Sequence, residues 1–125
     1  MRFLVVDDSA AIRRIVVNSL QRIGYSDIVE AADGAEGLAL LDPSIDFVIT
    51  DWNMPVMGGL DMVRAIRAQP GRSALPILMV TSRSVREDIL QAAQAGVNNY
   101  LVKPFTPQVL KDRIDEVLLK LKGAA

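Results

Sequence analysis

Short apolar runs alternate with longer amphipathic stretches along the whole of this 125-residue chain. Each run has the length of a β-strand and is rich in β-branched or aromatic residues. The runs beginning at Phe3, Phe47 and Ile77 are continuous rather than alternating, which is typical of strands covered on both faces. The five expected strands are Phe3–Val6, Ile28–Ala31, Phe47–Thr50, Ile77–Thr81 and Tyr100–Val102.

The stretches between these runs repeat apolar residues at the spacing of a helix face. Gly24, Pro70-Gly71 and Gly96 are stop signals for three of these helices, and Asp33-Gly34 opens another that ends near Asp42-Pro43. Thr106-Pro107 supplies the N-cap and first turn of the last helix. Five strands alternating with five helices predict a doubly wound parallel α/β sheet, forming one domain over residues 1–125.

The chain contains neither cysteine nor histidine. This excludes disulfides, thiolate nucleophiles, imidazole acid–base chemistry and ordinary zinc or haem sites. Any bound metal must be a hard cation such as Mg²⁺. The net charge of −1 disfavours a nucleic-acid-binding surface, and no apolar run approaches the ~20 residues that span a bilayer. We therefore expect a cytoplasmic monomer without nucleic-acid or membrane partners.

Four of the five expected strands end on polar residues. Asp7-Asp8 follow the first strand and Asp51 follows the third. Thr81-Ser82 end the fourth strand, and Lys103 follows the fifth. Ligands of open α/β sheets bind at the carboxyl ends of the strands, so these groups should converge at one edge.

Each of these groups has a simpler explanation when taken alone. Asp7-Asp8-Ser9 and Thr81-Ser82 are good residues for capping the helices that follow them. Asp51 could belong to a turn, and Lys103 could be a solvated surface lysine. The coincidence of all four favours a shared site, because capping requires no ammonium group facing three carboxylates.

A cluster of three carboxylates is stable only if protons or a cation reduce their repulsion. Mg²⁺ takes oxygen ligands and bridges phosphate oxygens, and a carboxylate can itself accept a phosphoryl group. Lys103 would neutralise charge on that group, and Thr81 would donate a hydrogen bond to it. The cluster therefore favours Mg²⁺-dependent phosphoryl transfer to a carboxylate.

Four segments resemble the receiver domain of two-component response regulators, and the likeness extends over essentially the whole chain. It is greatest to the single-domain chemotaxis regulators of that family, and it implies the flavodoxin-like strand order 2-1-3-4-5 and no output domain. The four segments are Val5–Ser9, Thr50–Pro55 with Gly58-Gly59, Thr81-Ser82 and Tyr100–Phe105.

The resemblance also implies roles for individual residues. Asp51 would accept the phosphoryl group and contribute to Mg²⁺ binding. Asp8 would be a direct ligand, Asp7 a ligand through water, and Asn53 a ligand through its backbone carbonyl. Lys103 would pair with the phosphoryl group, and its peptide bond to the following proline should be cis.

Thr81 and Tyr100 would form a switch, in which Thr81 moves toward the phosphoryl oxygens and the Tyr100 ring fills the space. A half-buried strand aromatic is the simpler explanation for Tyr100. The switch would alter the face of the fourth helix, fifth strand and fifth helix. Partner contacts are expected there, through Arg86, Ile89 and Leu90 together with Tyr100.

Asn53 and Arg83 stand two residues beyond Asp51 and Thr81, where the family varies. The resemblance implies that these two side chains tune the lifetime of the phosphoryl group. A solvated charge at a helix start explains Arg83 equally well.

The implied partners are a sensor histidine kinase, a flagellar motor switch or other motility component, and a phosphatase. The chain would not be an enzyme beyond catalysing its own phosphorylation and dephosphorylation.

A phosphohydrolase of the haloacid-dehalogenase type is disfavoured because Asn53 stands where its acid–base Asp is expected. A flavin carrier is disfavoured because Asp7-Asp8 would repel a flavin phosphate. A scaffold receiver that works without phosphorylation is disfavoured because all the acids remain.

Overall fold

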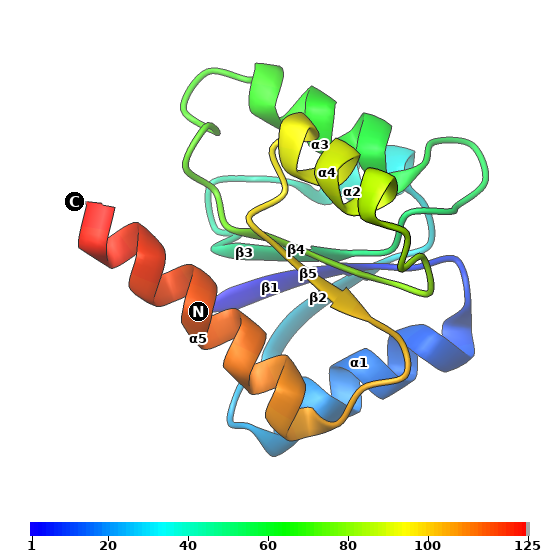
Figure 1. Ribbon diagram of the computed structural model, residues 1–125, viewed down its shortest axis with the longest axis vertical. Coiled ribbons are helices and arrows are strands. Elements are labelled where there is room, and N and C mark those ends of the chain that lie inside the picture. Colours follow the sequence, from blue (N-terminus) through cyan, green and yellow to red (C-terminus); the bar gives the residue numbers. More distant parts are fainter. Residues whose placement is uncertain (125) are drawn as a thin grey trace.

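The computed structural model describes residues 1–124 and contains a five-stranded sheet with helices on both faces (Figure 1). The strand order is β2-β1-β3-β4-β5, and every neighbouring pair is parallel. The predicted fold class and strand order are therefore confirmed. The strands are β1 (Arg2–Val6), β2 (Asp27–Ala31), β3 (Phe47–Thr50), β4 (Ile77–Thr81) and β5 (Asn99–Val102).

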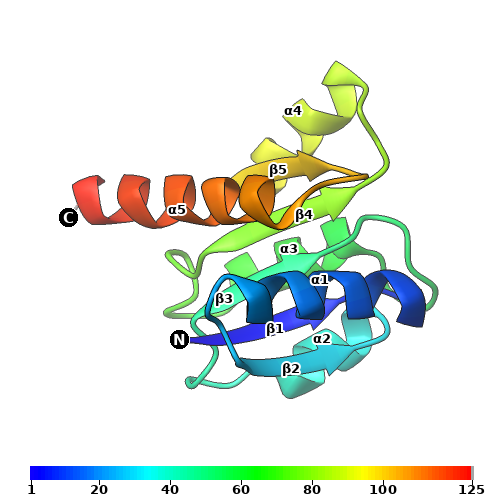
Figure 2. The same cartoon turned by 90° about the horizontal axis from the view of Figure 1, so that it is seen from below.

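Helices α1 and α5 cover one face of the sheet, and α2, α3 and α4 cover the other (Figures 1 and 2). Ser9, Asp33 and Thr106 cap α1, α2 and α5 by accepting a backbone N–H three residues later. No helix within residues 1–124 is both long and apolar enough to cross a membrane. The helices are α1 (Ala10–Arg22), α2 (Gly34–Leu40), α3 (Gly59–Ala68), α4 (Arg86–Ala95) and α5 (Pro107–Ala124).

The three central strands are buried on both faces, as their continuous apolar runs predict. Successive side chains of a strand point to opposite faces, so β1 contributes Phe3 and Val5 to one core and Leu4 and Val6 to the other. The first core is closed by α1 and α5, and the second by α2, α3 and α4. Packing on both faces fixes the strands whose carboxyl ends carry the polar residues.

Helix α2 ends at Leu40, two residues before the predicted end. Leu41 is already extended, with ψ of 117°, and the Asp42 carboxylate accepts the Ser44 N–H at 2.7 Å. This local turn competes with the last helical hydrogen bonds. Pro43 also disfavours the helical conformation of the residue before it, Asp42. The predicted end near Asp42-Pro43 is therefore two residues late, because the chain already forms the turn from Asp42 to Ser44 that contains Pro43.

The loop from β3 to α3 brings the start of α3 against the backbone of Asp51. The Gly59 N–H donates a 2.8 Å hydrogen bond to the Trp52 carbonyl. A Cβ atom at Gly59 would lie well inside van der Waals contact with the Asp51 carbonyl oxygen, which is part of the backbone and cannot rotate away. Gly59 is therefore required for the loop to turn so tightly after Asp51.

We expect Gly59→Ala to lower the free energy of unfolding by roughly 1–3 kcal/mol, the usual range for overpacking. Urea denaturation followed by circular dichroism measures the change. Gly58→Ala is the matched control, because the nearest heavy atom to its Cβ would be the Trp52 carbonyl oxygen at 3.1 Å. An equal loss in both variants would contradict the role given to the Asp51 contact.

Candidate functional site

The polar residues that end β1, β3 and β5 meet at one edge of the sheet. The Lys103 Nζ atom lies 2.9 Å from Asp51 Oδ2 and 3.1 Å from Asp7 Oδ2. One carboxylate oxygen from each of Asp7, Asp8 and Asp51 lies within 4.8 Å of the other two. The predicted convergence of three acids and an ammonium group is therefore confirmed.

The three acids differ in their exposure and contacts. Asp7 is 3% exposed, Asp51 is partly buried and Asp8 is exposed. The Asp8 side chain forms no hydrogen bond or ion pair with the side chains that the structure describes, those of residues 1–121. The Lys103 side chain is only 16% exposed, which excludes the alternative of a solvated surface lysine. The peptide bond from Lys103 to Pro104 is cis, as predicted.

Burial, hydrogen bonds and neighbouring charges shift the pKa values of Asp7 and Lys103. Burial raises the pKa of Asp7, and this effect outweighs the opposing hydrogen bond from the Ser9 N–H and the Lys103 charge. Burial alone would lower the pKa of Lys103, but the hydrogen bond and charge of Asp51, with those of Asp7, raise it overall. Lys103 is therefore held as a cation between the two carboxylates.

The turn after β1 serves both as a helix cap and as part of the site. The Ser9 hydroxyl caps α1, while the Ser9 N–H donates a 2.9 Å hydrogen bond to the Asp7 carboxylate. Arg13, which the sequence did not single out for the site, donates to the Asp7 carbonyl at 2.6 Å and pairs with Glu30 at 3.0 Å. Arg13 lies in the first part of the following helix, and its pairing with Glu30 depends on the position of β2.

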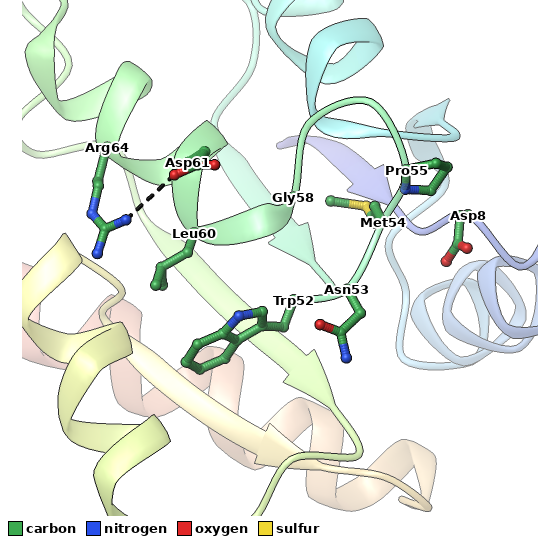
Figure 3. A pocket seen from close by; sticks show the side chains of 9 residues that line it. All are labelled: Asp8, Trp52, Asn53, Met54, Pro55, Gly58, Leu60, Asp61 and Arg64. Carbon is green, nitrogen blue, oxygen red and sulfur yellow. Dashed lines mark hydrogen bonds and ion pairs between the residues drawn. The ribbon is translucent and has the colours of Figure 1, made fainter.

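The loop after β3 forms the other side of the site. The Trp52 N–H donates a 2.6 Å hydrogen bond to Asp51 Oδ1. The Asn53 side-chain oxygen accepts from Arg83 at 2.9 Å, whereas its backbone carbonyl accepts no hydrogen bond from the residues that the structure describes. Asp8 and this loop line an open cavity of about 640 Å³, whose lining extends to Leu60, Asp61 and Arg64 of α3. Figure 3 shows Asp8 beside Met54 and Pro55 of the loop.

The predicted switch residues Thr81 and Tyr100 both contact the backbone of Arg83. Thr81 is 1% exposed, and its Oγ1 atom accepts the Arg83 N–H at 3.4 Å. The Tyr100 hydroxyl donates to the Arg83 carbonyl at 2.8 Å, and burial raises the pKa of Tyr100. Neither Thr81 nor Ser82 caps α4, whose N-cap position is Val85, so the capping alternative for this pair is wrong.

The Arg83 side chain is not a free solvated charge. Its guanidinium carbon lies 4.5 Å from the centre of the Trp52 ring, and its Nη1 atom forms a 3.3 Å ion pair with Asp88. The sequence did not single out Asp88. Arg83 lies before α4 and Asp88 within its first turn, and only the path of the loop between them brings the two side chains together.

The residues of the expected partner face divide between a groove and the exposed surface of α4. Ile89 and Tyr100 line a groove of about 700 Å³ between α4, β5 and α5. Leu90 is 50% exposed and Arg86 is also exposed, but neither lines this groove. Arg86 lies three residues before Ile89 and four before Leu90, so the three side chains share one side of α4.

Because the pKa of Asp7 is raised, the free energy of unfolding should depend on pH when no divalent cation is bound. The folded-state pKa lies above the ordinary value of 3.8, so the folded protein binds the proton more tightly than the unfolded chain. Stability relative to Asp7→Asn should therefore fall as pH rises through the folded pKa. Urea denaturation in EDTA at a series of pH values measures this difference. A difference independent of pH, or one that grows with pH, would contradict the assignment.

Comparison with known proteins agrees with this geometry. Residues 3–115 match the family described as response regulator receiver domain. The chemotaxis protein CheY of Pseudomonas aeruginosa is 48% identical over 124 residues, covering 98% of this chain and 100% of that protein. Chemotaxis protein CheY1 of Helicobacter pylori is 50% identical over 120 residues, covering 94% of this chain and 97% of that protein.

Solved structures show the same similarity in three dimensions. The chemotaxis response regulator CheY4 of Vibrio cholerae aligns with a TM-score of 0.85 and 40% identity, covering 93% of this chain and 97% of that one. A CheY-like receiver domain protein from Methanospirillum hungatei aligns with a TM-score of 0.86 and 28% identity, covering 99% and 98%. Sequence and fold agree over nearly the whole chain, which belongs to the response regulator receiver domain family.

Proposed function

We propose that this receiver accepts a phosphoryl group from a sensor histidine kinase on Asp51 and acts in chemotaxis or motility signalling. The observation that carries the proposal is the Asp51 carboxylate held 2.9 Å from the Lys103 ammonium group, beside two further carboxylates. The chemotaxis proteins at 48–50% identity support the pathway, and they support a cytoplasmic location.

The donor set fits Mg²⁺. Asp7, Asp8 and Asp51 present carboxylate oxygens within 4.8 Å of one another, and hard oxygen donors are what Mg²⁺ prefers. The Asn53 carbonyl, which accepts no hydrogen bond within the described residues, would complete the protein's ligands. When bound, Mg²⁺ neutralises carboxylate charge and provides a Lewis acid for a phosphoryl oxygen.

The transfer exchanges one bond to phosphorus for another. An Asp51 carboxylate oxygen attacks the phosphorus of a phosphohistidine, the P–N bond breaks, and the imidazole nitrogen that is released takes up a proton. The Lys103 ammonium group shifts its contact from the Asp51 carboxylate to an oxygen of the transferred phosphoryl group. The Thr81 hydroxyl donates a hydrogen bond to another phosphoryl oxygen. Attack of water on phosphorus later releases inorganic phosphate and restores Asp51, so the chain turns over only its own phosphoryl group.

Phosphorylation changes the binding of a partner at the groove between α4, β5 and α5. Movement of Thr81 toward the phosphoryl group changes the Arg83 backbone that holds the Tyr100 hydroxyl, and Tyr100 lines that groove. The occupant would be a flagellar motor switch or another motility component, with a phosphatase as a second partner. Asn53 and Arg83 lie beside Asp51 and would control the access of water to the phosphoryl group.

Asp51→Asn should abolish stable phosphorylation, because an amide is not a nucleophile toward phosphorus. Trp52, the single tryptophan, adjoins Asp51 and reports on the site. Wild type should show an Mg²⁺-dependent change in Trp52 fluorescence with acetyl phosphate or beryllofluoride, and the variant should not. A Mg²⁺-independent response that persists in Asp51→Asn would refute the proposal, and steady turnover of many phosphoesters would favour a hydrolase.

Mg²⁺ should raise the stability of the wild-type protein by about 1.4 kcal/mol at ten times its dissociation constant. Asp8→Ala should lose most of this increase, because Asp8 is the exposed acid with no other contact among the described residues. Thermal denaturation with and without Mg²⁺ measures the effect. Asp61→Asn is the control, since Asp61 lines the same cavity but lies outside the acid cluster. Equal stabilisation of the two variants would argue against this ligand set.

A further inference from the structure

Arg83 connects the site to α4 through its side chain. Its guanidinium lies against the Trp52 ring and donates a hydrogen bond to Asn53, the two residues that follow Asp51. On its other side it pairs with Asp88, in the first turn of α4. One cation thus links the phosphorylation loop to the start of the helix that borders the partner groove.

The first turn of α4 has few other anchors. Ala92 is the one fully buried residue of α4, and it lies in the second half of the helix. The helix has no side-chain N-cap, and Val85, Ile89 and Leu90 are exposed. The contact between Arg83 and Asp88 is therefore a main restraint on where α4 begins.

This restraint is weak in the unphosphorylated state. The Arg83 and Asp88 side chains are 37% and 24% exposed, so solvent screens their attraction. The Nε–H group of Arg83 is buried without a hydrogen-bond partner among the described residues, which is unfavourable for a charged donor. The guanidinium therefore holds this position with one donor unsatisfied.

A phosphoryl group on Asp51 changes the balance of these attractions. It adds negative charge and strong acceptor oxygens beside Trp52 and Asn53, and the fork of an arginine matches phosphate oxygens well. We infer that Arg83 is a positioning residue that turns from Asp88 toward the phosphoryl oxygens on phosphorylation and so releases the first turn of α4. This inference rests on the proposed function, and it adds a charge-driven path to the one through Thr81 and Tyr100.

NMR of the full chain with Mg²⁺, before and after adding beryllofluoride, tests the inference. In the free protein, the Arg83 Nε–H resonance should be displaced upfield by the ring current of Trp52. Beryllofluoride should remove that displacement and shift the backbone amides of the first turn of α4, residues 87–89.

Three variants separate this path from general effects on the site. Arg83→Gln should bind beryllofluoride more weakly, so it is compared at saturating beryllofluoride, as amides 50–53 report, where it should show about half or less of the wild-type shift in amides 87–89. Asp88→Asn should move amides 87–89 toward their activated positions before beryllofluoride is added. Glu87→Gln makes the same acid-to-amide change in the same turn, and Glu87 forms no ion pair with the side chains of residues 1–121, so it should behave as wild type.

The outcomes are distinguishable. If beryllofluoride leaves amides 50–53 of the wild type unchanged, the proposed function is overturned, and this inference with it. If amides 50–53 shift but amides 87–89 respond equally in wild type and Arg83→Gln, only the inference is overturned. Retention of the Trp52 ring-current displacement in the beryllofluoride complex would also overturn the inference alone.

Discussion

The Lys103 ammonium group lies between the Asp7 and Asp51 carboxylates, and the geometry of the whole site depends on this contact. Two parallel strands, β1 and β3, bring three acids to one edge, where their charges repel. Lys103 offsets part of that repulsion from a position that is only 16% exposed. Removing one partner of a buried ion pair typically costs about 3–5 kcal/mol. The excess negative charge that remains is what makes the edge suited to a divalent cation.

The rigidity of this edge contrasts with the first turn of α4. β1, β3 and β4 are packed on both faces, so the backbone from which the acids project cannot move far without disturbing a core. The loop from β4 to α4 is fixed chiefly by polar contacts of Arg83 with Trp52, Asn53, Asp88 and the Tyr100 hydroxyl. A change in charge at a rigid site can therefore reposition a weakly held neighbour while the sheet stays in place.

Much of the fold and the acidic site could be predicted because both depend on local patterns. Apolar runs of strand length mark the strands, and polar residues directly after them must meet where parallel strands end. Features that depend on competing local signals were harder to predict. The turn of Asp42 with Ser44 follows the end of α2 at Leu40, two residues before the predicted end. Thr81 suits a helix cap as well as the site for which it was predicted, and the structure shows that it does not cap α4.

The sequence by itself determined the order of elements, the layers and the meeting of Asp7, Asp51 and Lys103, because strand ends in a parallel sheet share one edge. Only the tertiary structure decided which groups those residues contact across long separations in the chain. Arg13 pairing with Glu30, 17 residues away, and Arg83 donating to Asn53, 30 residues away, are such contacts. They depend on loop paths and side-chain rotamers, which the packing of the whole domain selects and no periodic pattern encodes.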